Sequence, residues 1–240
     1  MKNTLLLSLF TLATLFSFAQ DGKVINDRNA QKRNVQGFHG IRISSGIDLY
    51  LSQSSEEAVA VSAAEPQYRD RIVTEVDNGI LHIYMENHGY HWWDRMRKHL
   101  KAYVSCKALD QLTASGGSDV YVQDAIHGDR LKMDLSGGSD LHGKFTVGDL
   151  TITQSGGSDS YISGSAGSLS IHTSGGSDYH GYDLAADHCQ VDASGGSDAY
   201  LTVNKELTAH ASGGSDIHYK GNGIIRDSHT SGSGSISHRD

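Results

Sequence analysis

The pentapeptide Ser-Gly-Gly-Ser-Asp occurs six times in this chain without a substitution. Successive copies are 18 to 21 residues apart, and a degenerate Ser-Gly-Ser-Gly-Ser follows 19 residues after the last one. Self-similarity at a fixed period of this size is typical of a stacked solenoid. Such a coil is too short for a strand, a helix and two turns, so the repeat predicts an all-β solenoid with three short strands per coil. The copies begin at Ser115, Ser136, Ser155, Ser174, Ser194 and Ser212.

The residues that precede each pentapeptide alternate between apolar or small and polar. Leu131, Met133 and Leu135 precede the second copy, and the other copies have similar residues at the same positions. Period-2 alternation indicates a strand with one buried face. We therefore expect these positions to form the core, and we expect the glycines to allow tight bends and close approach of stacked backbones.

Residues 1–19 have the features of a signal peptide. Lys2 supplies positive charge, a short apolar run extends to Phe18, and Ser17-Phe18-Ala19 forms a small-x-small cleavage site. The run is too short to span a bilayer. The sequence therefore predicts an exported protein that is not membrane-spanning. Residues 20–36 are expected to be a flexible N-terminal segment, and residues 37–240 a single β-helix domain with an aromatic insertion at 87–101.

The charge of the chain argues against a nucleic-acid partner, and the positions of its two cysteines argue against a disulfide. The formal net charge is −8 and there is no basic run, which argues against a nucleic-acid partner because phosphates require clustered Lys and Arg. An exported location favours disulfides. Cys106 and Cys189, however, are assigned to coils four apart. At ~4.8 Å per coil they would lie roughly 19 Å apart, beyond the ~7 Å limit for bridged Cα atoms, so no disulfide is expected.

The first half of the chain carries a diverged repeat and several further strands. Ser45-Gly46-Ile47-Asp48 resembles the later pentapeptide and places Asp48 in the Asp position. Strand-like runs follow at residues 58–62, 71–76, 80–85, 102–106 and 109–114. Asp77-Asn78-Gly79, between two of these runs, is a strong hairpin-turn signal.

The aromatic insertion interrupts this pattern with clustered Trp, Tyr, His, Arg and Lys. One interpretation is a loop or short helix whose Trp92 and Trp93 pack on the solenoid. Another is a contact surface, because Trp, Tyr and Arg dominate binding hot spots. A metal site built from the clustered His is disfavoured, because the Cys/His spacing of zinc sites is absent.

Two columns of outward side chains are expected to run along the stack. The Asp column holds the last residue of each pentapeptide: Asp119, Asp140, Asp159, Asp178, Asp198 and Asp216. The ring column lies two residues later on the same face, where Tyr and His alternate: Tyr121, His142, Tyr161, His180, Tyr200 and His218. Together they form the Asp-ring face, which is the candidate ligand-binding surface along with Trp92 and Trp93.

Three interpretations of the Asp-ring face are open. In the first, Ser and Asp cap backbone amides at the bend and the rings stack for stability. In the second, carboxylates ~5 Å apart disfavour one another's charge and bind cations. Calcium takes such oxygen ligands, although the nine-residue Gly-Gly-x-Gly-x-Asp pattern is absent. In the third, carboxylates bind sugar hydroxyls and the Tyr faces stack on sugar rings.

Three features of the chain resemble the head GIN domain family, whose members are described as auto-transporter adhesins common in Bacteroidetes. These are Phe38–Leu51, the turn from Asp77 to Leu81, and the run of pentapeptide coils. The likeness covers roughly residues 37–235, with Asp48 where the family name would place Asn. It implies a right-handed parallel β-helix and an exported location. It brings no catalytic residues with it.

Two function classes follow. The even recurrence of the same side chains favours a non-catalytic, exported adhesion or binding module, with carbohydrate or another cell-surface component as partner and with the oligomeric state left open. The alternative is a polysaccharide lyase or hydrolase that uses Tyr, His or paired carboxylates as acid and base. Such an enzyme would need one irregular cleft where different residues converge. No cofactor is expected, and calcium is the one candidate considered.

Overall fold

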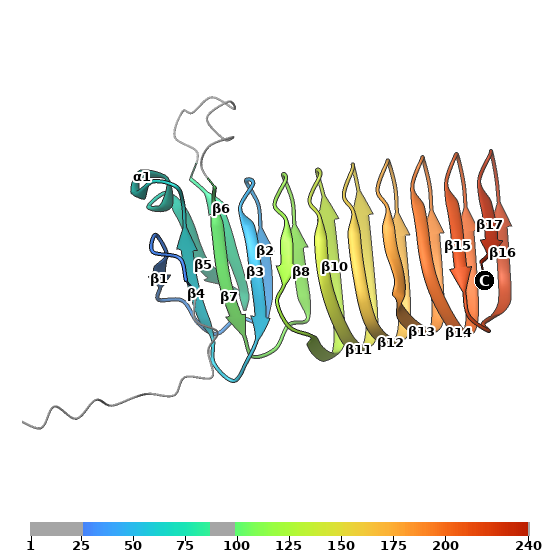
Figure 1. The fold of residues 1–240 in the computed structure, drawn as a ribbon, viewed down its shortest axis with the longest axis horizontal. Helices are drawn as coiled ribbons and strands as arrows, with labels where there is room; N and C mark the ends of the chain where they lie inside the picture. Colours follow the sequence, from blue (N-terminus) through green and yellow to red (C-terminus); the bar gives the residue numbers. More distant parts are fainter. Residues whose placement is uncertain (1–25, 87–98, 240) are drawn as a thin grey trace, which may run out of the picture.

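The pentapeptide repeats stack as the coils of a parallel β-solenoid of about seven turns, with about 19 residues per coil (Figure 1). The computed structural model describes residues 26–86 and 99–239, whose 17 strands join in one sheet. α1 (Pro66–Arg69) is the one helix in these ranges. The strands are β1 (Gln31–Arg33), β2 (Gly40–Ile43), β3 (Asp48–Gln53), β4 (Ala58–Ser62), β5 (Ile72–Asp77), β6 (Ile80–Met85), β7 (Lys101–Cys106), β8 (Gln111–Ala114), β9 (Val120–Val122), β10 (Ile126–Ser136), β11 (Leu141–Ser155), β12 (Ser160–Thr173), β13 (Tyr179–Ala193), β14 (Asp198–Ala211), β15 (Asp216–Lys220), β16 (Ile224–Thr230) and β17 (Ser235–His238).

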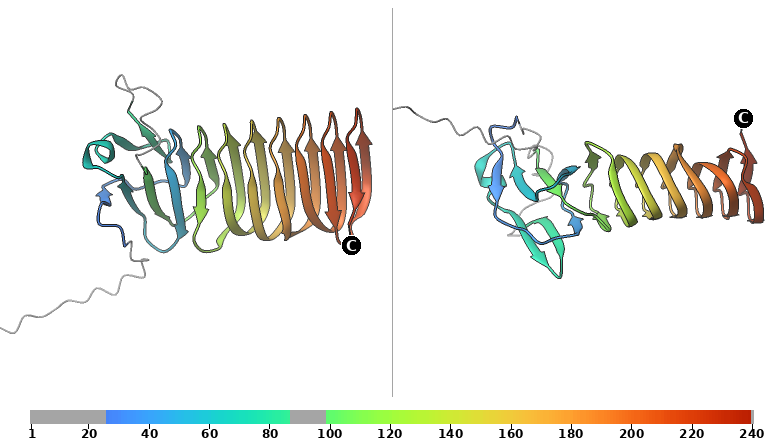
Figure 2. Two further views of the ribbon diagram at one scale, coloured as in Figure 1. Left: turned by 45° about the horizontal axis from the view of Figure 1, so that its top comes forward. Right: turned by 90° about the horizontal axis from the view of Figure 1, so that it is seen from below.

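Each coil from β11 to β14 is one continuous strand of 14 or 15 residues, so the expectation of three short strands per coil is wrong. In β11 the inside-outside alternation breaks once, at Gly148 and Asp149, which are both exposed between the buried Val147 and Leu150. The chain turns back at this far bend while Asp149 still pairs with Ser168 of the next coil. The ladder survives because neighbouring coils bend at the same position. The tight pentapeptide turns and the far bends form the two long edges of the stack (Figure 2).

The strand runs on either side of the far bend share one narrow core. The inward positions predicted before each pentapeptide are all buried, including Leu131, Met133 and Leu135 of β10. Gln154 occupies one of these positions, and its buried amide donates hydrogen bonds to two backbone carbonyls at 2.7 and 3.1 Å. Because both runs point inward at this core, their outward sides are opposite faces. We call the outward side of the run after each pentapeptide the first face, and the outward side of the run after the far bend the second face.

Large aromatic residues fill the core in the coils where the inward position after the ring column is glycine. Gly143 and Gly181 stand where other coils have Val, Ile, Leu or, after His218, Tyr219. Phe145 is fully buried, and a Cβ added to Gly143 would lie 2.7 Å from its ring. The ring of the fully buried Tyr179 occupies the corresponding space beside Gly181. Each glycine therefore makes room for a ring that its own coil supplies.

Replacing Tyr179 by Phe is expected to stabilise the protein. Among the residues that the structure describes, the Tyr179 hydroxyl, buried in the core, has no hydrogen-bond partner, and burial raises its pKa. A buried hydroxyl that lacks a partner costs about 1–3 kcal/mol, so its removal without a change of shape should raise the free energy of unfolding by about 1 kcal/mol. Urea denaturation would measure the change, with Tyr161→Phe at an exposed position as the control. A loss of stability in Tyr179→Phe would contradict the assignment.

The coils at the N-terminal end do not follow the order of the sequence. β2 pairs with both β6 and β8, and β3 pairs with both β7 and β9, all in parallel. The diverged repeat therefore lies directly against the first full pentapeptide coil, while β4 to β7 lie beyond it (Figure 1). After β3 the chain forms β4 to β7, which make up the N-terminal end of the stack. It then continues into the first full pentapeptide coil at β8.

This order corrects the position assigned to Cys106. It lies on β7, separated from β9 by β3, and not in the coil that leads to Ser115. Cys106 and Cys189 are both buried and unbridged, as expected. Burial raises the pKa of Cys106 to about 11 and that of Cys189 to about 12, so both stay protonated at neutral pH.

Antiparallel strands cover the N-terminal end of the stack. β1 pairs with β4, and β4 pairs with β7, so the parallel ladder ends in a mixed edge. β5 and β6 form the predicted hairpin, in which Asn78 and Gly79 have φ of 49° and 78°, as a type I′ turn requires. β1 lies inside the segment expected to be flexible, residues 20–36.

The signal-peptide prediction for residues 1–19 and most of the aromatic insertion, including Trp92 and Trp93, lie outside the described residues. Within the described ranges, no helix has the length and apolar character needed to cross a membrane.

Candidate functional site: the Asp-ring face and the groove opposite

The six predicted members of the ring column form one continuous stack on the first face. Parallel pairing in register places each ring beside the next, as with His142 and Tyr161. Tyr50 and Tyr103 extend the stack to eight rings. Neighbouring ring centroids are 4.6 to 5.5 Å apart. The sequence analysis missed Tyr103 because it did not place β7 next to β3.

Stacking leaves only the ring edges free for a ligand. Tyr161 has His142 against one face at 4.7 Å and His180 against the other at 4.6 Å, and yet 43% of the residue is exposed. Burial and then the neighbouring Asp carboxylates raise the pKa of Tyr161, so its hydroxyl stays a donor at neutral pH. A sugar ring cannot lie flat on these tyrosines without separating the stack. Recognition at this column therefore requires hydrogen bonds to the ring edges.

The Asp column is a ladder of side-chain to backbone hydrogen bonds. The Oδ1 atom of each Asp accepts a bond from the N–H of the next Asp along the stack. The distances are 3.1 Å from Asp140 to Asp119, 3.2 Å from Asp159 to Asp140, 3.0 Å from Asp178 to Asp159, 2.9 Å from Asp198 to Asp178 and 3.2 Å from Asp216 to Asp198. Ser235 ends the ladder by donating its hydroxyl to Asp216. This is the geometry of the first interpretation, in which Asp caps backbone amides.

The rest of the pentapeptide also has a structural explanation. Its two glycines are exposed, and its second Ser is fully buried in every copy. The hydroxyls of Ser118, Ser139, Ser158 and Ser177 accept bonds from the backbone of the neighbouring coil, as when the N–H of Ser118 donates to Ser139 at 3.1 Å and that of Ser139 donates to Ser158 at 3.4 Å. The pentapeptide is therefore a turn in which the side chains of one coil satisfy the backbone of another.

Calcium binding by the Asp column stays a prediction. One carboxylate oxygen of the Asp residues from Asp119 to Asp198 already accepts a backbone bond, which leaves Oδ2, and at Asp198 the Tyr200 hydroxyl donates to that atom at 3.4 Å. Within residues 26–86 and 99–239, no three His, Cys, Asp or Glu side chains are arranged to hold a metal ion. Any cation at this face would thus need ligands from solvent or from the bound partner.

Substitutions at Asp159 separate the capping role from the charge. Asp159→Ala leaves the half-buried N–H of Asp178 without its acceptor, so the free energy of unfolding should fall by about 1–2 kcal/mol. Asp159→Asn keeps an acceptor oxygen and removes one of a row of like charges, so stability should be retained. Urea denaturation at neutral pH would measure both variants. Equal losses in Ala and Asn would contradict the capping role.

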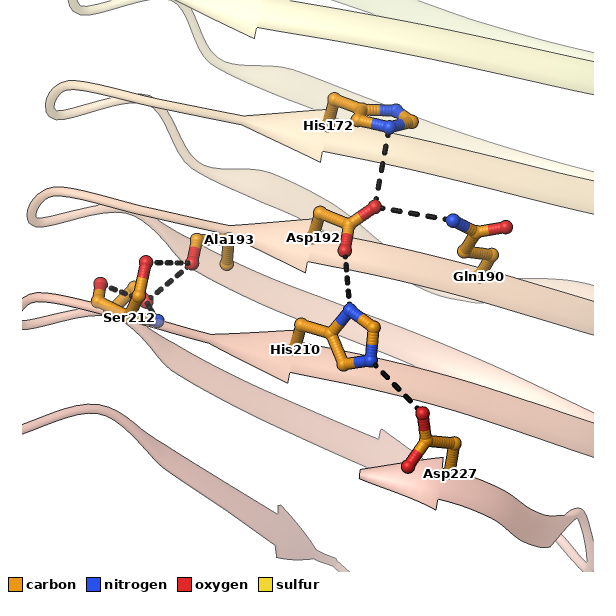
Figure 3. A network of polar contacts seen from close by, with 8 residues as sticks. His172, Gln190, Asp192, Ala193, His210, Ser212 and Asp227 are labelled. Atoms are coloured by element: carbon orange, nitrogen blue, oxygen red, sulfur yellow. Dashed lines mark hydrogen bonds and ion pairs between the residues drawn. The ribbon is translucent and has the colours of Figure 1, made fainter. Parts of the chain in front are cut away.

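A polar network joins four coils on the second face, where the sequence analysis singled out no residue (Figure 3). Asp192 lies between two imidazoles, with Oδ2 3.2 Å from His172 Nε2 and Oδ1 2.9 Å from His210 Nδ1. His210 Nε2 is 3.4 Å from Asp227 on β16. Hydrogen bonds to Asp192 and then to Asp227 raise the pKa of His210. This network ties β16, near the C-terminal end, to the coils before it.

The network predicts a pH dependence of stability. A raised pKa in the folded state stabilises the fold below the ordinary His value of ~6.5, and this contribution is lost as pH rises through the folded-state value. The pairs are solvent-exposed, so between pH 5.5 and 8 the wild type should lose ~1–3 °C more in melting temperature than His210→Gln. Asp192→Asn should flatten the profile in the same way. Parallel profiles for all three proteins would show that the network does not titrate.

A groove of about 920 Å³ runs along the second face beside the far bends. Residues from coil after coil line it, from Gln111 of β8 to Arg226 of β16. Its charged side chains pair with one another, with Arg130 3.4 Å from Asp149, His188 3.3 Å from Glu206, and Arg226 also on Glu206. The uncharged polar side chains between them include Thr151, Ser168, Ser170, Gln190 and Thr208.

Asp149 and Glu206, two of the carboxylates that line the groove, are poorly placed for acid-base hydrolysis. Asp149 and Glu206 lie three coils apart by register, or ~14 Å, whereas paired glycosidase carboxylates lie within ~9.5 Å. A general acid also needs a raised pKa. Hydrogen bonding to Arg226, and then to His188, lowers the pKa of Glu206. These two carboxylates therefore do not form the acid-base pair that the enzyme alternative needs.

Comparison with known proteins places the chain among adhesin-like solenoids. Residues 37–223 match the family model described as "Putative auto-transporter adhesin, head GIN domain". No curated protein matches the sequence. The fold is similar to that of a putative adhesin from Bacteroides fragilis, with 19% identity over 88% of this chain and 96% of the other and a TM-score of 0.79.

Two Parabacteroides structures show the same fold. A putative adhesin from Parabacteroides merdae has 16% identity over 88% of this chain and 95% of the other, with a TM-score of 0.70. A putative lipid-binding protein from Parabacteroides distasonis has 18% identity over 88% of this chain and 96% of the other, with a TM-score of 0.66. At these identities the likeness concerns the fold alone. The family match covers most of the sequence, and the chain therefore belongs to the head GIN domain family.

Proposed function

We propose that the protein is an exported, non-catalytic adhesion module that contacts carbohydrate or another cell-surface component through the edge of the Asp-ring face. The observation that carries this proposal is the register of the ring column, in which eight rings present their edges once per coil. A surface that repeats in this way can make many weak contacts to a ligand that also repeats. Such contacts combine into high avidity when they engage together.

Two further observations support a binding role over catalysis. The family description supports an adhesion-like role. The Asp-ring face repeats one Asp and one ring per coil, with Tyr and His alternating, so no one coil provides a set of different residues in acid, base and positioning roles. Adhesion requires only that the ligand reach the exposed hydroxyls, imidazole nitrogens and outward carboxylate oxygens.

The test removes the tyrosine hydroxyls without disturbing the stack. The triple variant Tyr121→Phe, Tyr161→Phe and Tyr200→Phe keeps every ring and loses three edge donors. Each lost hydrogen bond costs about 0.5–1.5 kcal/mol, so binding to an immobilised glycan array should weaken by roughly tenfold or more. Tyr84→Phe, on β6 and outside the column, is the control.

The melting temperature of the triple variant should match that of the wild type, because stacking is retained. Unchanged array binding in the triple variant would exclude the tyrosine edges as the contact surface. An equal loss in Tyr84→Phe would show that the effect does not belong to the Asp-ring face.

A further inference from the structure

The groove on the second face has the dimensions of a site for a polymer. It holds about 920 Å³ and is lined by residues from successive coils, so its long direction follows the solenoid axis. The Asp-ring face lies on the opposite side of the core. The groove is therefore a separate surface from that of the proposed function, and a ligand there would lie parallel to the stack.

The charges of the groove favour an uncharged occupant. Arg130 pairs with Asp149, Lys132 with Asp134 at 3.2 Å, and Arg226 with Glu206. A charged polymer would have to separate these pairs before it could use them, and the groove offers no surplus of one sign. The hydroxyl and amide groups between the pairs can donate and accept hydrogen bonds without such a cost. This chemistry suits a polyhydroxylated ligand.

The repeat of the groove favours a polysaccharide over a peptide. The groove positions pair in register, as Asp149 with Ser168 and Ser168 with His188, so a corresponding position recurs once per coil, every ~4.8 Å, although the residue type changes. An extended peptide advances ~3.3 Å per residue and would fall out of step within a few coils. One pyranose ring of a linear, extended polysaccharide has nearly the length of one coil. Each added sugar would then lie against the corresponding position of the next coil.

We infer that the groove binds a linear, uncharged polysaccharide that lies parallel to the solenoid axis, with about one sugar ring per coil. Thr151, Ser168, Ser170, Gln190 and Thr208 supply hydrogen bonds to its hydroxyls. The ion pairs along the groove hold the long side chains in place at its walls. The site binds its ligand without cleaving it.

Calorimetric titration with cellohexaose and mannohexaose tests this inference directly. At least one hexasaccharide should bind, and at least tenfold more tightly than its trisaccharide, because the longer chain meets more coils. Ser168→Ile places a bulky apolar group in the middle of the groove and should weaken binding at least tenfold. Ser165→Ile is the matched control, since Ser165 is equally exposed on the same strand but does not line the groove.

Other variants and ligands make the outcome decisive. Thr151→Val and Thr208→Val are nearly isosteric and should also weaken binding while the fold is kept. The triple Tyr→Phe variant of the Asp-ring face should bind the hexasaccharide as the wild type does, so the two proposals fail separately. Three results would each overturn the inference: no binding of either hexasaccharide, equal effects of Ser168→Ile and Ser165→Ile, or tighter binding of the acidic hexagalacturonate.

Discussion

Replacing Phe145 by Ala is expected to lower the free energy of unfolding by about 3–5 kcal/mol, which is the usual cost of truncating a buried Phe. Phe145 is fully buried, and its ring fills the space beside Gly143 together with the side chain of Val122. Each of the two opposite runs of a coil contributes one layer of side chains to the narrow core. Neighbouring coils therefore cannot easily move into the cavity that Phe145→Ala would leave. Urea denaturation of the two proteins would measure the loss.

Phe145→Leu keeps most of the volume and is the control, with an expected cost below about 1.5 kcal/mol. The double variant Gly143→Ala and Phe145→Leu should be more stable than the sum of the two single changes, because the smaller side chain makes room for the added methyl group. A Phe145→Ala cost below about 1 kcal/mol would mean that the ring does not carry the packing assigned to it.

Replacing Gly175 by Ala should cost about 2–3 kcal/mol, whereas the same change at the next residue should cost almost nothing. Gly175 has φ of +80°, and an added Cβ would lie 2.8 Å from the carbonyl oxygen of Gly156 in the preceding coil. An added Cβ on Gly176 would meet that same oxygen at 3.9 Å, an ordinary contact distance, and Gly176 does not have positive φ. Gly175 and Gly176 are adjacent, exposed glycines of the same pentapeptide.

The pair therefore tests the stacking of the pentapeptide turns without changing any core side chain. Thermal denaturation of both alanine variants gives the comparison. The turn geometry would be refuted if Gly176→Ala were the more damaging change. The same contrast is expected at Gly195 and Gly196, where an added Cβ would lie 2.9 Å and 3.8 Å from the carbonyl oxygen of Gly175.

Much of the solenoid could be predicted because its strongest constraint is local. The pentapeptide sets the turn, and the alternation before it sets which side chains point inward, as with Leu131, Met133 and Leu135. The far bend could not be predicted as clearly, because no single motif marks it. It appears in the sequence only as two successive polar or small residues, such as Gly148 and Asp149, where the alternation slips by one.

The order of the N-terminal coils was hidden for a different reason. Neighbouring repeats in sequence are usually neighbours in a solenoid, which placed Cys106 in the coil that leads to Ser115. The resemblance of Ser45–Asp48 to the later pentapeptide was the available signal, because like turns stack on like turns. Once that coil lies against the first full repeat, β7 must lie beyond it, and Tyr103 then joins the ring column.

The candidate sites also differ in how well they could be predicted from the sequence. The Asp and ring columns could be predicted because their residue types repeat, and the structure places all twelve of the expected Asp, Tyr and His residues in two columns. The groove and the His172-Asp192-His210 network were missed because residue types change from coil to coil there. A signal was available in the outward positions of the second face, where His and carboxylate residues come into register in successive coils.

The central claim is that function is spread along the stack and does not reside in one coil. Two single-coil deletions test it most directly: removal of residues 155–173, which joins Gln154 to Ser174, and removal of residues 174–193, which joins Thr173 to Ser194. The measurement is binding of each purified deletion protein to the immobilised glycans that the wild type selects. Both deletions should keep β-rich circular dichroism and weaken binding modestly and by similar factors. Abolition of binding by one deletion, with no effect of the other, would contradict the claim and place the function in a single coil.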